Sequence, residues 1–186
     1  MPNIGIDRLT IKDIMKMVRE ETSIQLSDVA KAQVTRCREY IDGILNKDKT
    51  VYGVNTGFGP LCDVRISDDD INLLQENLLL THAVGVGEYL SKELTTLMLI
   101  SKIHALAKGH SGVRVALLDR LIYFVNNDLI PAVPSQGSVG ASGDLAPLSH
   151  LFLPVIGYGH FLSDNGHIPA KDVLKSHGLD LSLIHI

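Results

Sequence analysis

Residues 137–150 read Gly-Ser-Val-Gly-Ala-Ser-Gly-Asp-Leu-Ala-Pro-Leu-Ser-His, a loop with glycine at positions 137, 140 and 143. These glycines leave the backbone with little steric restraint. If the loop folds back on itself, the amide nitrogen of Gly143 can reach the carbonyl carbon of Ala141. Ring closure with loss of water, including the hydroxyl of Ser142, would leave a methylidene-imidazolone, which is a strong electrophile. The residue types therefore allow a reactive group to form from the chain itself, and Asp144 could assist the proton transfers.

Three common glycine-rich motifs do not fit this loop. A P-loop requires a lysine after its glycines, and none follows here. A hydrolase nucleophile elbow, Gly-x-Ser-x-Gly, would need glycine where Asp144 stands. A dinucleotide-binding fingerprint follows a strand, whereas helical periodicity surrounds this loop. On the glycines alone, a flexible connector remains the alternative.

Two stretches of the chain carry a family resemblance. Residues 137–150 resemble the prosthetic-group signature of the aromatic amino acid ammonia-lyases and the related aminomutases. Residues 52–59, Tyr-Gly-Val-Asn-Thr-Gly-Phe-Gly, resemble the other hallmark loop of that family, in the same order and at a similar separation. The resemblance implies a mainly α fold with a glycine-rich prosthetic-group loop and a small β-hairpin. It also implies a 4-methylideneimidazol-5-one formed autocatalytically from Ala141, Ser142 and Gly143, with no metal or external cofactor.

The resemblance implies roles for the 52–59 loop as well. Tyr52 matches the candidate general base of the family. A phenol has a pKa near ~10, so the site would have to lower that pKa through positive charge or hydrogen bonds. Asn55 and Gly59 are expected at the substrate. Composition alone would instead make this segment a structural connector with a packed tyrosine.

Residues 77–87, Asn-Leu-Leu-Leu-Thr-His-Ala-Val-Gly-Val-Gly, resemble the substrate-selectivity segment of the family. Histidine-specific members carry a small hydroxyl residue and then histidine, tyrosine-specific members histidine and then leucine, and plant-type phenylalanine enzymes phenylalanine and then leucine. Thr81-His82 therefore indicates L-histidine as the substrate and urocanate as the product, with threonine where serine is more usual. A lone histidine beside leucines is otherwise more often a hydrogen-bonded core residue. Tyrosine or phenylalanine ammonia-lyase or aminomutase activity remains an alternative, as does a non-catalytic helical scaffold.

Composition and charge narrow the setting. The 186 residues are 45% apolar and 20% charged, which is typical of a globular chain with a sizeable core. The formal net charge of -4 and the lack of a basic run argue against nucleic acid and anionic membranes as partners. No apolar run approaches the ~20 residues of a membrane helix. Cys37 and Cys62 form neither a CxxC pair nor a disulfide framework, and we expect a cytoplasmic protein.

Capping residues and periodicity predict several helices. Thr10 to Asp13 is a capping box, and Ser27 opens a longer amphipathic helix. Ser67 and the acidic triplet 68–70 predict the start of the selectivity helix, not a metal site. Further elements are expected as helices from Ser91, from Ser111, over 148–156 and over 170–177, with a hairpin turning at Asn165-Gly166.

The family resemblance stops at about Asp180. Residues 181–186, Leu-Ser-Leu-Ile-His-Ile, resemble a translated sequencing-library adapter, and a genuine apolar terminus is the alternative. We expect residues 1–180 to be the N-terminal, prosthetic-group-bearing portion of an ammonia-lyase. The family builds its active site at the subunit interfaces of a homotetramer, with further substrate-contacting residues downstream. We therefore expect the chain alone to be inactive.

Overall fold

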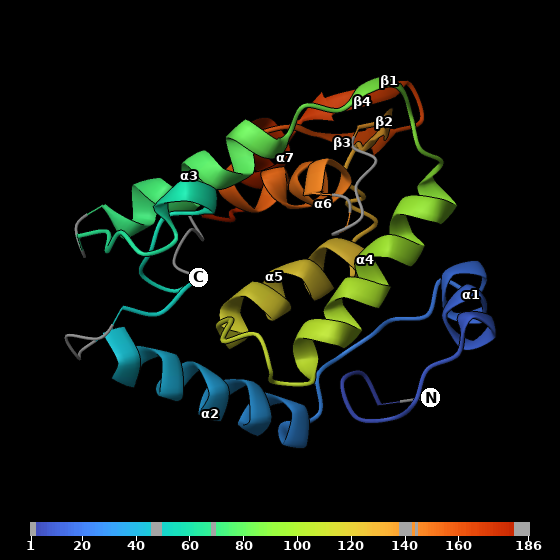
Figure 1. Ribbon diagram of the computed structural model, residues 1–186. Helices are drawn as coiled ribbons and strands as arrows, with labels where there is room; N and C mark the ends of the chain where they lie inside the picture. The colour runs from blue at the N-terminus through green and yellow to red at the C-terminus, as the bar shows by residue number, and fades with distance from the viewer. Residues whose placement is uncertain (1–2, 46–49, 68–69, 138–142, 144, 181–186) are drawn as a thin grey trace.

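The computed structural model describes residues 3–45, 50–67, 70–137, 143 and 145–180. Its described part is mainly helical, with two small antiparallel sheets, as expected for the fold class (Figure 1). The elements are α1 (Ile11–Arg19), α2 (Asp28–Leu45), the 3-10 turn η1 (Gly59–Leu61), α3 (Ile71–His82), β1 (Val86–Tyr89), α4 (Lys92–Ala107), α5 (Val115–Asn126), β2 (Pro134–Gln136), α6 (Leu145–Phe152), the 3-10 turn η2 (Leu153–Ile156), β3 (His160–Ser163), β4 (Gly166–Pro169) and α7 (Ala170–Ser176). The expectations for Ala141, Ser142, Asp144 and the 181–186 tail lie outside the described residues.

Side-chain caps set the start of three helices where the sequence predicted them. The Thr10 hydroxyl accepts the backbone N–H of Asp13 at 3.3 Å, and the Asp13 carboxylate accepts the backbone N–H of Thr10 at 2.8 Å. Hydrogen bonds from the side chain and backbone of Thr10 hold the pKa of Asp13 below its ordinary value of 3.8. The hydroxyls of Ser27 and Ser91 each accept a backbone N–H three residues on, at 3.2 and 3.3 Å. These caps confirm the expected beginnings of α1, α2 and α4.

The predicted start of α5 at Ser111 is wrong, because the helix begins at Val115. Gly112 has a φ of +66°, and a Cβ there would lie 2.6 Å from Cγ1 of Ile41 on α2. This glycine therefore lets α2 approach the connection between α4 and α5, and the helix cannot begin until that contact is passed.

The small sheets differ from expectation in two ways. The predicted hairpin forms, but Ser163 pairs with Gly166, so the turn residues are Asp164 and Asn165, one position earlier than predicted. β1 pairs with β2 across nearly fifty residues of sequence, with Val86 opposite Gln136. No local pattern had indicated this second ladder.

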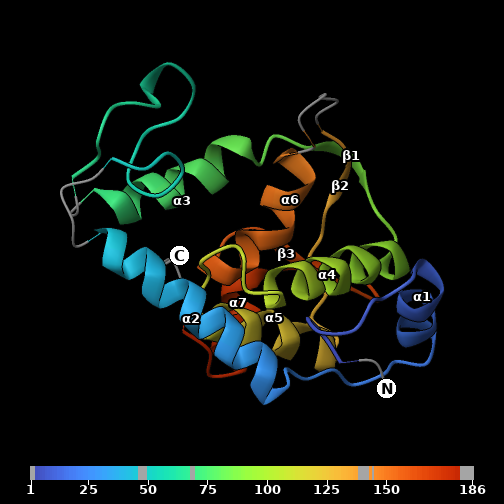
Figure 2. The ribbon, with the colours of Figure 1, turned by 60° about the horizontal axis from the view of Figure 1, so that its bottom comes forward.

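The core lies where α4 crosses α5, with α1 and α2 on one side and α6, η2 and the hairpin on the other (Figures 1 and 2). The rings of Phe124 on α5 and Phe161 on β3 meet edge to face, with centroids 5.0 Å apart. Both rings are almost fully buried, so they join the helical core to the hairpin. The largest side chains buried with them include Leu99, Ile100, Ile103, Leu118, Leu121 and Leu151. No described helix is long and apolar enough to cross a membrane.

Replacing Phe124 by alanine should lower the free energy of unfolding by about 3–5 kcal/mol, because it removes a buried ring and leaves a cavity against Phe161. Urea denaturation followed by circular dichroism measures the change. Tyr40→Ala, at an aromatic side chain that is 71% exposed, is the control and should cost less than about 0.5 kcal/mol. Equal losses from the two variants would contradict the core described above.

Candidate functional site

Helix α3 carries the residues expected to select the substrate at its C-terminal end. It begins at Ile71, later than the predicted Ser67, because the Ser67 hydroxyl accepts the backbone N–H of Asp70 and closes a turn before the helix. The helix packs against α6, and it is apolar in composition. Yet none of its twelve residues, all of them described, is buried. The helix therefore lies on the surface of the chain and leaves apolar side chains uncovered.

Thr81 and His82 occupy the last turn of α3. The Nδ1 atom of His82 lies 2.7 Å from the carbonyl oxygen of Leu78, which can only accept, so Nδ1 carries the hydrogen. In the neutral ring, Nε2 is then a hydrogen-bond acceptor. The Thr81 hydroxyl donates to the carbonyl of Asn77 at 2.7 Å and so points back to its own helix. Of the two side chains, that of His82 still has an atom, Nε2, that can accept a hydrogen bond from a ligand.

The chain just beyond His82 meets both flanks of the glycine loop. β1 pairs with β2, the strand that leads into the loop. The backbone N–H of Gly85 donates to Nε2 of His150, on the helix that leaves the loop, at 2.9 Å. A Cβ at Gly137 would lie 3.0 Å from the Cβ of Ala146, so the two flanks of the loop are in close contact. The structure therefore brings the chain that follows α3 to both flanks of the glycine loop.

Gly85 and His150 were not singled out from the sequence as site residues. His150 is half-buried, and burial lowers its pKa from the ordinary 6.5, which favours the neutral ring that the hydrogen bond requires. A Cβ at Gly85 would lie 2.9 Å from Nε2 of His150 and 3.1 Å from the Cβ of Pro134. Only glycine fits this approach. The signal in the sequence was weak, since Gly85 is part of an apparent helix break and His150 is one residue of a short helix.

Gly143 is the described member of the expected prosthetic tripeptide. Its φ is +115°, a backbone conformation that residues with side chains rarely adopt. Among the other residues that the structure describes, none places a heavy atom within 4 Å of the position that a Cβ would take. This freedom fits the folded-back geometry that ring closure through the Gly143 nitrogen requires. Ala141, Ser142 and Asp144 are outside the described residues.

The 51–66 loop is organised by its own buried polar groups. The Asn55 side chain is fully buried and accepts the backbone N–H of Val51 at 2.8 Å. The Thr56 side chain, also buried, accepts the backbone N–H of Gly53 at 3.3 Å. Farther along, the N–H of Ile66 donates to the backbone carbonyl of Asn55 at 2.9 Å and closes the loop. Segments of this kind, with close ends and internal packing, are compact surface loops.

Tyr52 projects from this loop. Its side chain is 63% exposed and contacts the ring of Phe58 edge to face, at 5.8 Å between centroids. The alternative of a packed structural tyrosine is therefore wrong.

Gly59, with a φ of +57°, begins η1, and a Cβ there would have no described neighbour within 4 Å. In both ribbon views the loop lies toward the start of α3, whereas β1, β2 and the start of α6 lie toward its end (Figures 1 and 2).

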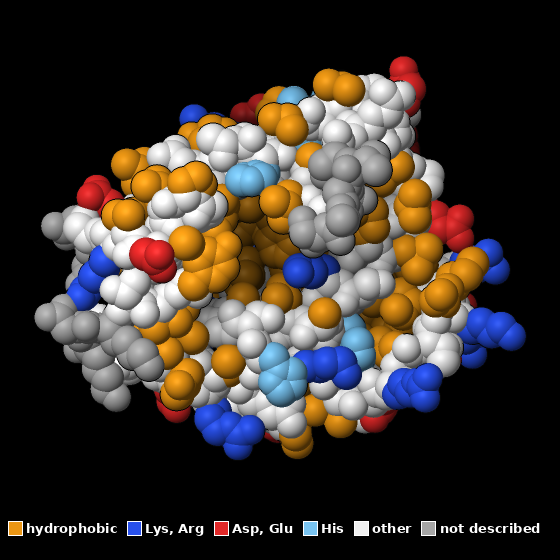
Figure 3. Space-filling view, viewed as in Figure 1, with side chains coloured by type: hydrophobic (Ala, Val, Ile, Leu, Met, Phe, Trp, Pro, Cys, Tyr) orange, Lys and Arg blue, Asp and Glu red, His pale blue; other side chains and the backbone are white. Residues whose placement is uncertain are grey.

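One face of the molecule is hollowed between α3, α6 and α5 (Figure 3). Hydrophobic side chains lie in the depth of this hollow, and a histidine lies on its rim. Small-molecule sites commonly have this make-up, with an apolar lining and few polar groups. The hollow is therefore the candidate binding face.

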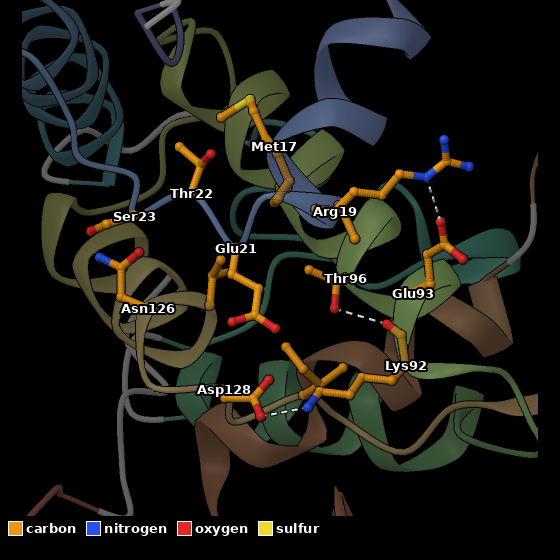
Figure 4. A pocket seen from close by; sticks show the side chains of 14 residues that line it. Met17, Arg19, Glu21, Thr22, Ser23, Lys92, Glu93, Thr96, Asn126 and Asp128 are labelled. Atoms are coloured by element: carbon orange, nitrogen blue, oxygen red, sulfur yellow. Dashed lines mark hydrogen bonds and ion pairs between the residues drawn. The ribbon is translucent and has the colours of Figure 1, made fainter.

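A second groove, of about 630 Å³, lies where the end of α1, the start of α4 and the end of α5 meet (Figure 4). Its rim charges pair with each other: Arg19 with Glu93 at 3.4 Å and Lys92 with Asp128 at 2.5 Å. The amide of Asn126 is engaged with the backbone of the connection from α1 to α2. None of the residues expected at the active site lines this groove, so it is not the candidate site.

The described residues include no cluster of metal-ligating side chains. Within the ranges given above, no group of three or more His, Cys, Asp or Glu side chains could hold a metal ion.

The chain is similar to known proteins in both sequence and fold. The sequence profile of the aromatic amino acid lyases matches residues 9–184. The chain is 42% identical over 169 residues to a histidine ammonia-lyase of Staphylococcus saprophyticus, covering 91% of this chain and 34% of that protein. Two solved structures are similar: a histidine ammonia-lyase from Trypanosoma cruzi (TM-score 0.85, 35% identity, 97% of this chain and 34% of that chain) and a tyrosine aminomutase from Streptomyces globisporus (TM-score 0.88, 31% identity, 97% and 34%). The chain spans about a third of the length of these relatives.

Replacing Asn55 by alanine should open the 51–66 loop, because the buried N–H of Val51 loses its acceptor. Amide exchange at Val51 and at Ile66 should accelerate by about tenfold, the ratio expected for one net hydrogen bond. Tyr52→Phe is the matched control, because this residue is 63% exposed and the substitution keeps its ring contact with Phe58. Unchanged exchange in Asn55→Ala would show that the side chain does not organise the loop.

Proposed function

Because this chain belongs to the aromatic amino acid lyase family, we propose that it is the N-terminal portion of a histidine ammonia-lyase. The proposed reaction is the non-oxidative elimination of ammonia from L-histidine to give urocanate. Two observations support it together: the similarity to proteins named histidine ammonia-lyase, and the contact that Gly85, three positions after His82, makes with a flank of the glycine loop. In the 186-residue chain alone we expect no turnover, since it spans about a third of those relatives.

The substrate proposal rests on the tautomer of His82. With its Nδ1 hydrogen committed to Leu78, His82 offers Nε2 as an acceptor. A neutral imidazole side chain has an N–H to donate to it, whereas a phenyl ring has none. A site that hydrogen-bonds a substrate group discriminates strongly against an analogue lacking that group, because its own polar atom is then left unpaired. L-Histidine is accordingly favoured over L-phenylalanine at this position.

The prosthetic group that we propose, 4-methylideneimidazol-5-one from Ala141, Ser142 and Gly143, supplies an electrophile that unmodified side chains lack. Asp144 is proposed to assist proton transfer during its formation. Tyr52 is proposed to accept the β-proton of the substrate, which requires a neighbour that lowers the pKa of its phenol. Asn55 is proposed to act through the shape that it gives the loop, because its side chain is fully buried there, and Gly59 through its backbone.

We also propose a cytoplasmic homotetramer with a small-molecule substrate and no nucleic-acid or membrane partner. Exposed apolar side chains around α3 support an assembly in which this surface is covered. They are Leu73, Val84, Val86 and Leu145, each more than half exposed. Patches of this kind mark protein interfaces.

A second candidate is an aminomutase acting on tyrosine, which the similarity to the tyrosine aminomutase favours. A tyrosine side chain also has a hydroxyl hydrogen to donate to Nε2 of His82. A non-catalytic helical scaffold is the alternative outside enzymology. Comparing turnover of L-histidine, L-tyrosine and L-phenylalanine separates the three.

Replacing Ser142 by alanine tests the lyase proposal, because it removes the hydroxyl that must leave. In the complete polypeptide that contains residues 1–180, we expect an intact mass lower than the encoded mass by two water molecules. In Ser142→Ala the methylidene cannot form, and turnover of L-histidine should fall by about 10³-fold or more. Ser138→Ala, in the same loop but outside the tripeptide, is the control and should keep the mass loss. A folded polypeptide with its full encoded mass and no turnover would contradict the proposal and favour the scaffold.

A further inference from the structure

Three segments distant in sequence meet at one hydrogen bond. They are the connection after α3, the strand that enters the glycine loop, and the helix that leaves it. The backbone N–H of Gly85 donates to Nε2 of His150 at 2.9 Å, although the two residues are 65 positions apart. Pro134 closes the same contact from the strand, since a Cβ at Gly85 would lie 3.1 Å from its Cβ. The imidazole of His150, on α6, thus contacts the connection after α3 at the point where that connection approaches Pro134 of β2.

The chemistry of this contact defines the state of the imidazole. A backbone N–H can only donate, so Nε2 of His150 must carry the lone pair and Nδ1 the hydrogen. An imidazolium has no acceptor atom and cannot make this bond. Burial lowers the pKa of His150, in agreement with a neutral ring. Gly85, for its part, must lack a side chain, because a Cβ would lie 2.9 Å from Nε2 and 3.0 Å from Cδ2 of the ring.

We propose that His150 is a positioning residue, which fixes the end of α3, and with it His82, against the two flanks of the glycine loop. It acts through Gly85, whose backbone N–H it accepts. The two residues of this hydrogen bond are close in sequence to residues of the proposed site. His82 lies three positions before Gly85, and His150 is the last residue of the 137–150 stretch. Its effect on catalysis rests on the proposed function, whereas the hydrogen bond and the tautomer do not.

The first test measures the 186-residue chain by nitrogen and amide-proton NMR. We expect the nitrogen shifts of His150 to show hydrogen on Nδ1 and none on Nε2 at neutral pH. In His150→Leu, exchange of the Gly85 amide should accelerate by about tenfold, as expected for the loss of one net hydrogen bond. Signals of residues 81–87 should shift, and signals from the centre of α4 should stay. In His150→Gln, whose amide oxygen can also accept, Gly85 should recover part of its protection.

The chain offers a matched control at His104. Its Nδ1 accepts the backbone N–H of another glycine, Gly5, at 3.0 Å, far from the glycine loop in sequence. His104→Leu should expose the Gly5 amide to exchange and leave Gly85 and residues 81–87 unchanged. Hydrogen on Nε2 of His150 in the unaltered chain would overturn the proposal, even if the variants fail to fold. Unchanged exchange at Gly85 in His150→Leu would overturn it as well.

A second test uses the complete polypeptide and separates this inference from the proposed function. If His150 positions the end of α3, His150→Leu should raise KM for L-histidine by about tenfold while the mass loss in the tripeptide persists, and His150→Gln should reverse much of that rise. A KM unchanged in His150→Leu overturns the positioning role. If no amino acid is turned over but the NMR results hold, the proposed function fails and the hydrogen-bonded positioning of the 81–87 segment stands.

Discussion

The close approach at Gly85 is the constraint on which the arrangement of this site depends. The imidazole of His150 and the ring of Pro134 leave room there for a hydrogen and for nothing larger. Because the approach is this close, the N–H of Gly85 reaches Nε2 of His150, and Val86 falls into register opposite Gln136. The end of α3 and the two flanks of the glycine loop are thereby fixed relative to one another. Because Gly85 has no side chain, the end of α3 and the flanks of the glycine loop can lie together, and the proposed chemistry needs both.

The molecule divides into a packed part and a sparsely packed part, and the candidate site belongs to the second. In the described part of the chain, α4 and α5 supply half of the twelve largest fully buried side chains, among them Leu99, Ile103, Leu118 and Phe124. α3 buries none, and its position depends on α6 and on the polar contact at Gly85. Regions with few buried apolar contacts open more easily than the core. Stability of the core therefore says little about the order of the site, which has to be measured at residues 81–87 themselves.

The sequence predicts what short-range chemistry determines. The capping box at Thr10, the serine caps of α2 and α4 and the hairpin arise from residues within a few positions of each other, and all of them form. The late start of α5 was missed because Gly112 looked like part of a helix, when its role is to admit Ile41 from α2. The ladder of β1 and β2 and the contact of Gly85 with His150 were also missed, because each joins residues that are distant in sequence. Their partners lie 50 and 65 positions apart, where neither periodicity nor capping carries information.

The loop that carries Tyr52 raises a separate physical question. The buried side chains of Asn55 and Thr56 accept backbone N–H groups of the loop from inside it, at Val51 and Gly53. Tyr52 itself is exposed and has Phe58 as its ring neighbour, an apolar group that gives no stabilisation to a phenolate. Under the proposed function, a proton-accepting role for Tyr52 requires a cation or a hydrogen-bond donor close enough to lower the pKa of a phenol. The apolar surface left open around α3, which comprises Leu73, Val84, Val86 and Leu145, is where a partner in the proposed assembly would pack. The position of the segment that follows His82 therefore depends on a contact between residues 65 positions apart, Gly85 and His150, whereas the shape of the Tyr52 loop depends on side chains within the loop.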